Sequence, residues 1–484
     1  MKLFLILCIL PIYNGFLFPT PKRSLFLDLP YKPVEGGRHT TCDVKSGNIP
    51  KEMYGKTCSR IGPNPKYEPS GGYHWFDGDG MTHSLNIDME GKITYHNELV
   101  QTERLKFEQK HGGSIFFNIG DFFRPFALLK MLTLECFSKM GIIPDIPMIN
   151  MSPANTNLVK HGEKILALCE AGLPYSMTYD KKFSTDGIED FSGFIDGPLT
   201  GHPKTILSDN GYTYYFGTTG EIVKVYVFDQ FGKSLRKFDI SLESKSIMHD
   251  FAVSKNHILI LDMPLVLNYK LLFKGRLPVE FDKTRKSRIG VLPIDASDGS
   301  TVKWYYLNDT FAISHVVNVY DNSTDGSINL ITCDLKDVFL HPKELFKNRS
   351  EVYKTIIDMK NNRTTRTKLV EHEKSIDFPV ISKYLTGVNN RYVYMTELTD
   401  GLPGNIIKID IHSGEKLCST DISEYSGECF FIEKDGIEDD GYIASFLTKG
   451  DNSEFCIWDA KDLSEVCRIS IPYRIPLGFH TLVF

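Results

Sequence analysis

Four of the fourteen histidines stand in surroundings that set them apart. His202 lies in Leu-Thr-Gly-His-Pro-Lys, His249 in Ile-Met-His-Asp-Phe and His315 in Ile-Ser-His-Val-Val-Asn, while His480 lies four residues from the C-terminus. Each lies on or beside an apolar, strand-like run, so the four rings could point inward toward one axis. A histidine of this kind points to function only if other histidines arrive at the same place. Taken singly, each is more typical of a core histidine whose hydrogen bonds are satisfied.

The C-terminal stretch, from Ile471 to Phe484, is apolar and contains two prolines. Chain ends usually fray, and an apolar end has to be held against the rest of the protein. In a ring-shaped β fold the final strand commonly closes the ring. Such a strand would bring His480 to the centre of the molecule, where the other histidines could meet it.

A hairpin-like unit recurs along the chain from about Arg60 onward. In it, an apolar, β-branched run is followed by an Asp, a Gly or polar turn, and a second such run. The clearest turns are Ile87–Lys92, Val227–Lys233, Ile294–Gly299, Ile409–Gly414 and Trp458–Leu463. Hairpins over most of the chain, without β-α-β alternation, predict one all-β, antiparallel fold. A β-propeller would accommodate so many strands and protect their edges, although the spacing is irregular and no WD-type repeat is visible.

The composition is that of an ordinary globular protein, with 484 residues of which 42% are hydrophobic and 24% charged. The net charge of -6 and the lack of a Lys/Arg run argue against nucleic-acid binding. Aromatic residues make up 12%, with 32 Phe and 23 Tyr, which suits strands and apolar cavities. No low-complexity linker divides the chain, so we expect one domain over residues 16–484.

Residues 1–15 predict a signal peptide. They carry one positive charge, Lys2, followed by an apolar run that is too short to span a bilayer. An apolar arm that docks on the protein body is the alternative. A signal peptide would direct the protein to the secretory pathway or the cell exterior, and without one the protein would be cytoplasmic. The cysteines do not settle the compartment, since removing Cys8 would leave an odd number, nine.

Two segments interrupt the strand pattern. Residues 116–137 are rich in Phe and Leu and predict a helix that begins near Pro125, and residues 263–273 form a second apolar run. Charged residues, among them Asp121 and Lys130, exclude a spanning helix but suit a segment that lies in a membrane interface. Packing in the core is the alternative for both segments.

The segments that carry a family resemblance follow one another in order over residues 35–484. They are Arg60-Ile-Gly-Pro-Asn-Pro65, Tyr73-His-Trp-Phe-Asp-Gly-Asp-Gly-Met-Thr-His83, Gly201-His-Pro-Lys204, Met248-His-Asp-Phe251, Ser314-His-Val-Val-Asn318, Glu438-Asp-Asp-Gly441 and Ile475-Pro-Leu-Gly-Phe-His480. With them the sequence resembles the carotenoid cleavage oxygenase family. This family includes animal carotene oxygenases, the retinoid isomerohydrolase, and plant and bacterial apocarotenoid and stilbene oxygenases.

The resemblance implies a seven-bladed β-propeller in which helices and loops cap an Fe(II) site on the axis. Matched motif to motif, the iron ligands would be His202, His249, His315 and His480, and no other residue would be catalytic. Four neutral imidazoles suit a first-row metal, and octahedral geometry then leaves two positions open. O2 and a substrate double bond could meet at these positions.

In the family, carboxylates bind the second nitrogen of three ligand histidines. The matching residues are Glu170, Asp377 and Glu428. Asp377 departs from the family, which usually has Glu there. Because Asp is one methylene shorter, the hydrogen bond could be lengthened, bridged by water or restored by a backbone shift. The run Asp77-Gly-Asp-Gly80 lacks EF-hand spacing, and the resemblance makes it a structural turn.

The implied function is oxidative cleavage of a conjugated double bond in a carotenoid or apocarotenoid, as in retinal metabolism, with O2 as co-substrate and two carbonyl products. Retinoid isomerohydrolysis and stilbene cleavage are alternatives on the same scaffold. A propeller that binds apocarotenoids without turnover is an alternative of another class. A zinc hydrolase is least favoured, because four histidines without a ligating carboxylate fit no usual hydrolytic zinc site.

Carotenoids are nearly insoluble in water, so the substrates must pass from lipid into a tunnel through an apolar rim. The resemblance places this rim near the two apolar segments and implies a peripheral membrane surface as a partner. The rim candidates are Phe122, Phe123, Phe126, Leu129, Leu132, Leu265, Leu267, Leu271 and Phe273. Lys130, Lys270 and Lys274 would remain at the level of the lipid head groups.

Overall fold

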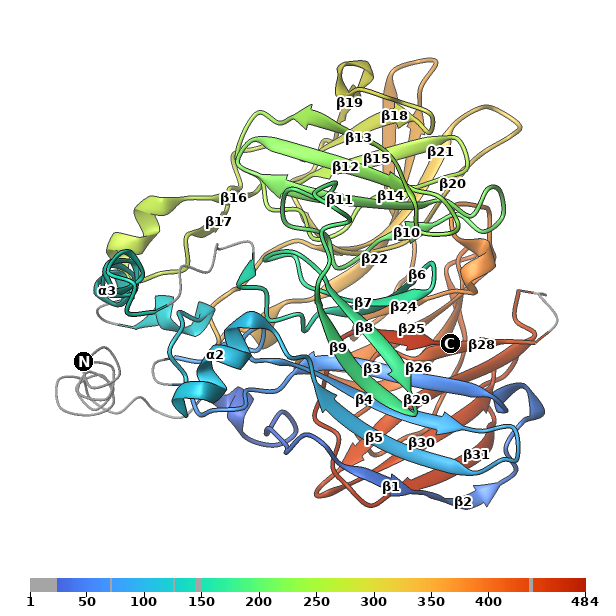
Figure 1. Ribbon diagram of the computed structural model, residues 1–484. Helices are drawn as coiled ribbons and strands as arrows, with labels where there is room; N and C mark the ends of the chain where they lie inside the picture. Colours follow the sequence, from blue (N-terminus) through green and yellow to red (C-terminus); the bar gives the residue numbers. More distant parts are fainter. Residues whose placement is uncertain (1–23, 70–71, 125–126, 144–149, 435–437) are drawn as a thin grey trace.

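The computed structural model describes residues 24–69, 72–124, 127–143, 150–434 and 438–484. The predicted signal peptide, residues 1–15, and Phe126 lie outside these residues. The described chain is a seven-bladed β-propeller, in which seven antiparallel sheets of four or five strands are arranged in a ring (Figure 1). The predicted all-β class and the propeller are confirmed.

Five blades consist of four strands that pair in chain order. The first two are β6–β9 (Asn157–His161, Lys164–Leu168, Tyr175–Asp180, Lys182–Ile188) and β10–β13 (Lys204–Thr205, Thr213–Thr219, Ile222–Phe228, Ser234–Ser241). The third is β14, β15, β18 and β19 (Ala252–Val253, His257–Asp262, Arg288–Pro293, Lys303–Tyr306). The other two are β20–β23 (Ala312–Asp321, Ile328–Leu335, Ser350–Asp358, Arg363–Lys368) and β24–β27 (Ser375–Val380, Tyr392–Thr399, Leu402–Asp410, Glu415–Ser419).

The remaining two blades have five strands because each takes in strands from both ends of the chain. One contains β28–β31 (Phe430–Glu433, Gly441–Lys449, Asn452–Asp459, Glu465–Ile471) with β2 (Asp43–Gly47) at its outer edge. The other contains β1 (His39–Thr41), β5 (Ile93–Leu99), β4 (Gly80–Ile87), β3 (Lys56–Pro63) and β32 (Thr481–Val483), in that order. The C-terminal strand β32 pairs with β3 and closes the ring, as predicted.

All five turns singled out in the sequence join adjacent strands of a blade. In the β4–β5 turn the Asp88 carboxylate accepts hydrogen bonds from two backbone N–H groups, and Asp229 does the same in the β12–β13 turn. Gly91, with φ 83°, adopts the left-handed conformation that ends the first of these turns. Asp and Gly therefore act here as the turn residues that the pattern predicts.

The hydrophobic core lies between neighbouring blades. For example, Phe216 and Val225 of the β10–β13 blade form one buried cluster with Phe251 and Ile258 from the next blade. Each fully buried side chain of this kind contributes ~1.5–3 kcal/mol. This packing sets the spacing of the blades, and therefore the distances among the side chains that reach the axis.

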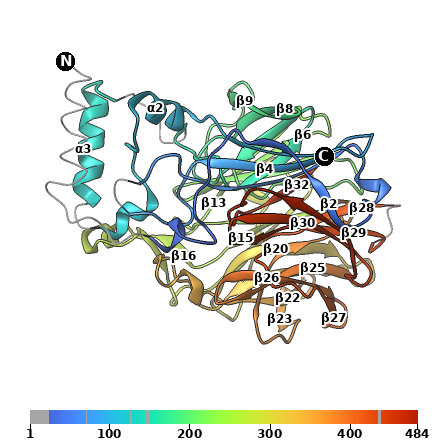
Figure 2. The ribbon, with the colours of Figure 1, turned by 90° about the horizontal axis from the view of Figure 1, so that it is seen from below.

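Helices and loops gather at one end of the ring, on the left in Figure 1. They comprise α2 (Glu103–His111), η4 (Ile119–Phe123), α3 (Ala127–Lys139), the hairpin of β16 (Leu265–Leu267) and β17 (Val279–Phe281), and η6 (Tyr269–Lys274). α3 begins two residues after Pro125, as predicted, and lies beside η6 (Figures 1 and 2). Short 3-10 helices lie elsewhere at Leu25–Leu27, Lys51–Met53, Gly299–Thr301, Leu345–Lys347 and Lys383–Leu385. Among the described residues, no helix has the length and apolar character needed to cross a membrane.

Asp77 joins this helical cap to the propeller. Its carboxylate accepts hydrogen bonds from the backbone N–H groups of Ile119 at 2.7 Å, Gly120 at 2.8 Å and His74 at 2.9 Å. Burial nevertheless raises the pKa of Asp77 to about 6. The Asp77-Gly-Asp-Gly80 run is thus a turn whose first carboxylate holds η4 in place.

Candidate metal centre

Four histidines from four different blades converge at the axis of the ring. His202 lies two residues before β10, His249 three residues before β14, His315 within β20 and His480 directly before β32. Each of these is an edge strand, and edge strands of neighbouring blades contact one another at the centre. One nitrogen of each imidazole lies within 4.8 Å of the corresponding nitrogens of the other three.

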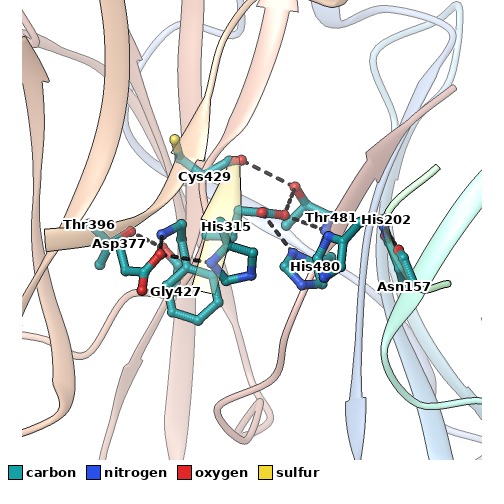
Figure 3. Close-up of polar contacts among 12 residues, drawn as sticks. Asn157, His202, His315, Asp377, Thr396, Gly427, Cys429, His480 and Thr481 are labelled. Atoms are coloured by element: carbon teal, nitrogen blue, oxygen red, sulfur yellow. Dashed lines mark hydrogen bonds and ion pairs between the residues drawn. The ribbon is translucent and has the colours of Figure 1, made fainter. Parts of the chain in front are cut away.

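The spacing of these nitrogens suits a single metal ion. The Nε2 atoms of His202 and His249 are 3.0 Å apart, and those of His249 and His315 are 3.4 Å apart. Metal–imidazole bonds are about 2.0–2.1 Å long, so two ligands at right angles around one ion lie about 3 Å apart. The rings of His202 and His480 meet at 84°, edge to face rather than stacked. Figure 3 shows His202, His315 and His480 directed toward a common centre.

The three remaining blades supply carboxylates that orient three of the imidazoles. Glu170, in the turn after β7, lies 2.7 Å from His249 Nδ1. Asp377 accepts a hydrogen bond from His315 Nδ1 at 2.7 Å, and Glu428 accepts one from His480 Nδ1 at 2.9 Å (Figure 3). With Nδ1 engaged by a carboxylate, each ring presents its Nε2 lone pair to the centre.

The electrostatics of the site keep His202 neutral. Burial holds its pKa well below the usual range, and the three neighbouring imidazoles and Lys204 act in the same direction. For His249, burial also acts to lower the pKa, but the Glu170 carboxylate outweighs it and raises the pKa above the usual value. A neutral His202 can bind a metal directly. At pH values below the pKa of His249, that ring carries a proton that it must release before it can bind a metal.

Asp377 reaches His315 directly despite its short side chain. Its second oxygen accepts a hydrogen bond from Ser314 Oγ at 2.7 Å. The strand bulges between Asp377 and Val380, and Phe378 adopts a left-handed φ of 54°. A left-handed conformation is unfavourable for a bulky residue, by of order 1–3 kcal/mol. The contact between Asp377 and His315 is therefore direct and of ordinary length, and it occurs where the strand bulges.

Apolar rings stand next to the imidazoles. The ring of Phe378 lies 5.4 Å from that of His315 and 6.0 Å from that of His480. Phe479, next to His480 in sequence, packs against Trp75 with 4.9 Å between centroids. An apolar ring therefore stands beside two of the four imidazoles, in a place that suits an apolar substrate.

Comparison with known proteins identifies the family. The family model described as retinal pigment epithelial membrane protein matches residues 31–482. A carotenoid 9,10(9′,10′)-cleavage dioxygenase of Crocus sativus is 34% identical over 468 residues, which cover 90% of this chain and 84% of the relative. One from Arabidopsis thaliana is 33% identical and covers 90% of this chain and 85% of the relative. The chain belongs to the carotenoid cleavage oxygenase family.

Solved carotenoid oxygenase structures share the fold. The lignostilbene dioxygenase of Pseudomonas brassicacearum superposes with a TM-score of 0.80 at 20% identity, covering 96% of this chain and 99% of that one. The cobalt-substituted apocarotenoid oxygenase of Synechocystis gives a TM-score of 0.76 at 22% identity, covering 92% and 96%. The resemblance read from the motifs is confirmed at the level of family and fold.

The rim candidates divide into three groups in the structure. Leu129 and Leu132 of α3 are exposed, as is Phe273 of η6, whose exposed fraction is 82%. The half-buried candidates are Phe122, Phe123, Leu265 and Leu267. Leu271 is buried, since η6 turns it toward the protein, so its assignment to the rim was wrong. Lys130 is also buried and bonds Asp121 at 2.7 Å, which contradicts its expected place at the head groups.

Residues beyond the predicted set complete the site. Thr481 donates both its N–H and its hydroxyl to Glu428, and Asn157 donates to the carbonyl of Gly201, next to His202. Lys204 and Asp250 form an ion pair of 2.7 Å beside the ligands. Both lie inside the histidine motifs quoted above, one or two residues from a ligand, and this proximity is the signal that could have found them.

Proposed function

We propose that this protein is an Fe(II)-dependent dioxygenase that cleaves a conjugated C=C bond of a carotenoid or apocarotenoid with O2 and releases two carbonyl products. The observation that carries the proposal is the four-imidazole centre, in which all ligand atoms lie within 4.8 Å of one another. The relatives named carotenoid cleavage dioxygenases, at 33–34% identity, support the substrate class.

The donor set favours iron over zinc in a hydrolytic role. Hydrolytic zinc sites usually combine three protein ligands, often with a carboxylate, and a bound water. Here four imidazoles surround the centre and carboxylates engage the outer nitrogens of three of them, so an ion bound by the neutral rings would keep its full charge. Bound Fe(II) would supply the redox chemistry with O2 that such cleavage requires.

The protein itself has two tasks in this reaction. His202, His249, His315 and His480 would hold the metal by Nε2, and the strands of four blades fix the directions of their rings. The Phe378 ring stands beside the His315 and His480 imidazoles, and an extended polyene could lie against it with one double bond toward the ligands. A bound polyene would displace water there and so protect the reacting bond.

Product analysis tests the proposal. Protein loaded with Fe(II) under anaerobic conditions would be mixed with O2 and β-carotene, lycopene, an apocarotenal or resveratrol, with O2 uptake and products measured. We expect O2 consumption and aldehyde or ketone products from a carotenoid or apocarotenoid. Cleavage of resveratrol alone would favour the stilbene reaction, and isomerised retinoid without O2 uptake would favour isomerohydrolysis. Iron-replete protein that consumes no O2 with any polyene would refute the dioxygenase.

We further propose that the enzyme takes its substrate at a membrane surface. Support comes from α3 and η6, which lie side by side and carry exposed apolar side chains: Leu128, Leu129, Leu132, Tyr269 and Phe273. An exposed cluster of this kind is typical of a membrane or protein interaction site. A polyene could pass from lipid across this cluster without entering bulk water. If residues 1–15 act as a signal peptide, the membrane would face the secretory pathway or the cell exterior.

A further inference from the structure

His202 is held differently from the other three imidazoles. Among the residues that the structure describes, no carboxylate lies against its ring, whereas His249, His315 and His480 each have one. The segment around His202 is instead fixed through its backbone: its N–H donates to Thr200 Oγ1 at 3.0 Å, and the preceding carbonyl accepts from Asn157 at 2.7 Å. The contacts that fix the position of His202 relative to the ligands of the next blades are therefore made by its segment of the chain and not by its ring.

A single buried carboxylate, Asp250, spans these blades. Its Oδ1 accepts from Lys204 Nζ at 2.7 Å, and its Oδ2 accepts from the N–H of Val316 at 2.7 Å. The same carboxylate receives the N–H of Phe251 at 2.8 Å. The Asp250 side chain is 1% exposed and that of Lys204 is 16% exposed, so both charges are largely withdrawn from water.

Each partner of Asp250 lies next to a ligand. Asp250 follows His249 directly, Lys204 lies two residues after His202, and Val316 follows His315 directly. The three segments belong to three successive blades, β10–β13, the β14 blade and β20–β23. We propose that Asp250, acting through Lys204 and the Val316 N–H, is a positioning residue that sets His202, His249 and His315 relative to one another. The inference rests on the proposed metal centre.

The energetics of the pair agree with a positioning role. Withdrawing a carboxylate and an ammonium from water costs several kcal/mol per ion, and an ion pair offsets this only with good geometry and further hydrogen bonds. Such a pair is weak support for stability alone. Asp250 also neutralises Lys204, whose cation would otherwise stand unpaired near the position of a divalent metal and oppose its binding.

Replacing Asp250 therefore removes both the link between the ligand segments and the neutralisation of Lys204. Different variants can separate these two effects. Asp250→Asn leaves one oxygen to accept a backbone N–H but ends the pairing with the ammonium. Lys204→Met removes the cation together with the link to the His202 segment. The Lys408–Asp439 pair is also 2.7 Å apart and joins β26 of one blade to the β28–β29 connection of the next, with neither residue adjacent in sequence to a ligand. It offers the matched control Asp439→Asn.

The test uses Co2+ as a spectroscopic probe, added to metal-free full-length protein. Loss of an outer partner of a metal ligand typically weakens binding about 10–100-fold. We expect a loss of this size in Asp250→Asn and in Lys204→Met, with a changed visible spectrum, since the ligand geometry changes. Asp439→Asn should keep wild-type affinity and spectrum. Melting temperatures of the metal-free proteins show whether any loss follows from general destabilisation.

Three outcomes would overturn the inference. One is wild-type Co2+ affinity and spectrum in a folded Asp250→Asn. Another is an affinity loss that Asp439→Asn shares at an equal drop in melting temperature. The third is an Asp250→Asn protein that does not fold while folded Lys204→Met binds Co2+ as the wild type does. Failure of the wild-type protein itself to bind Co2+ would instead refute the proposed metal centre.

Discussion

A histidine binds a metal through one ring nitrogen, and the hydrogen bond at its other nitrogen decides which one is free. In this site the carboxylates of Glu170, Asp377 and Glu428 engage Nδ1, so the Nε2 atoms face the centre. The buried Asp377 is stabilised as a carboxylate: burial acts to raise its pKa, but His315 and Ser314 hold this pKa below the usual range. At this scale, function depends on which atom each residue presents.

Replacing any one ligand should empty the site. In His202→Ala, His249→Ala, His315→Ala and His480→Ala we expect iron content to fall to background and turnover to be lost. His412→Ala is the control, because His412 is exposed in the β26–β27 turn and its ring bonds only Asn389 among the described residues. Metal analysis and product formation would be measured for all five. If His412→Ala behaved like the others, the ligand assignment would fail.

The Asp377 position should tolerate a carboxylate but not its loss. Asp377→Ala removes the partner of His315 Nδ1, so we expect metal affinity to fall about 10–100-fold. Asp377→Glu restores the residue usual in the family and should retain or improve affinity. Both would be followed by anaerobic iron titration. Wild-type affinity in both variants would show that the 2.7 Å contact does not act on the metal.

At the scale of elements, α3 has an unusual distribution of side chains. Its charged Lys130 is buried against Asp121, while Leu128, Leu129 and Leu132 face solvent. A helix of a water-soluble surface normally shows the opposite arrangement. The Lys130–Asp121 pair and the hydrogen bonds of Asp77 to η4 therefore hold an apolar surface outward. This outward apolar face of the cap is the feature on which the proposed membrane contact depends.

Removing apolar side chains from the cap should release the protein from membranes. Burial in lipid of each large apolar side chain would contribute ~1.5–3 kcal/mol to membrane binding. Replacing three of them would therefore remove a large share of the binding free energy. We expect Leu129→Ser, Leu132→Ser and Phe273→Ser together to abolish flotation with liposomes while activity on detergent-dispersed substrate is kept.

A matched control carries the same chemical change outside the cap. Met89 and Phe231 are 74% and 76% exposed in the β4–β5 and β12–β13 turns, so Met89→Ser with Phe231→Ser removes similar apolar area there. Flotation of this variant should equal that of the wild type. Unchanged flotation of the cap variant, or loss of its folding, would return those residues to a structural role.

At the scale of the whole molecule, stability is linked to buried carboxyl groups. Burial raises the pKa values of Asp77, Asp79 and Asp334 to about 6. In the unfolded chain they would titrate near 3.8. Between about pH 4 and about pH 6, the folded state therefore binds more protons than the unfolded state. For this reason these three groups make the free energy of unfolding fall as pH rises through this range.

Asp79→Asn should remove one of these contributions. Asn keeps an oxygen that can accept the hydrogen bond of the Lys66 N–H, but it cannot ionise. We expect its stability relative to the wild type to improve as pH rises from about 4 to about 6, by up to ~3 kcal/mol, since one pKa unit corresponds to 1.36 kcal/mol. Chemical unfolding of the metal-free proteins across this range measures the difference. A difference that does not vary with pH would contradict the raised pKa.

Much of the architecture follows from short-range patterns in the chain. The Asp and Gly turns, the strand-like runs around them and the apolar C-terminus are local features, because turn geometry and side-chain alternation depend on neighbouring residues. They predict antiparallel hairpins, ring closure by the last strand and a central position for His480, and the structure has all three. The helix after Pro125 follows from the same local reasoning.

Other features depend on which residues the ring brings together. His315 and Asp377 are 62 residues apart and meet only because neighbouring blades pack in one register. The contact between Asp250 and Val316, 66 residues apart, spans blades in the same way. The outward face of α3 and the burial of Leu271 and Lys130 likewise follow from how the elements of the cap pack together. A sequence pattern records the character of a side chain, whereas its partner is set by packing between elements, and for that reason only the tertiary structure decided these contacts.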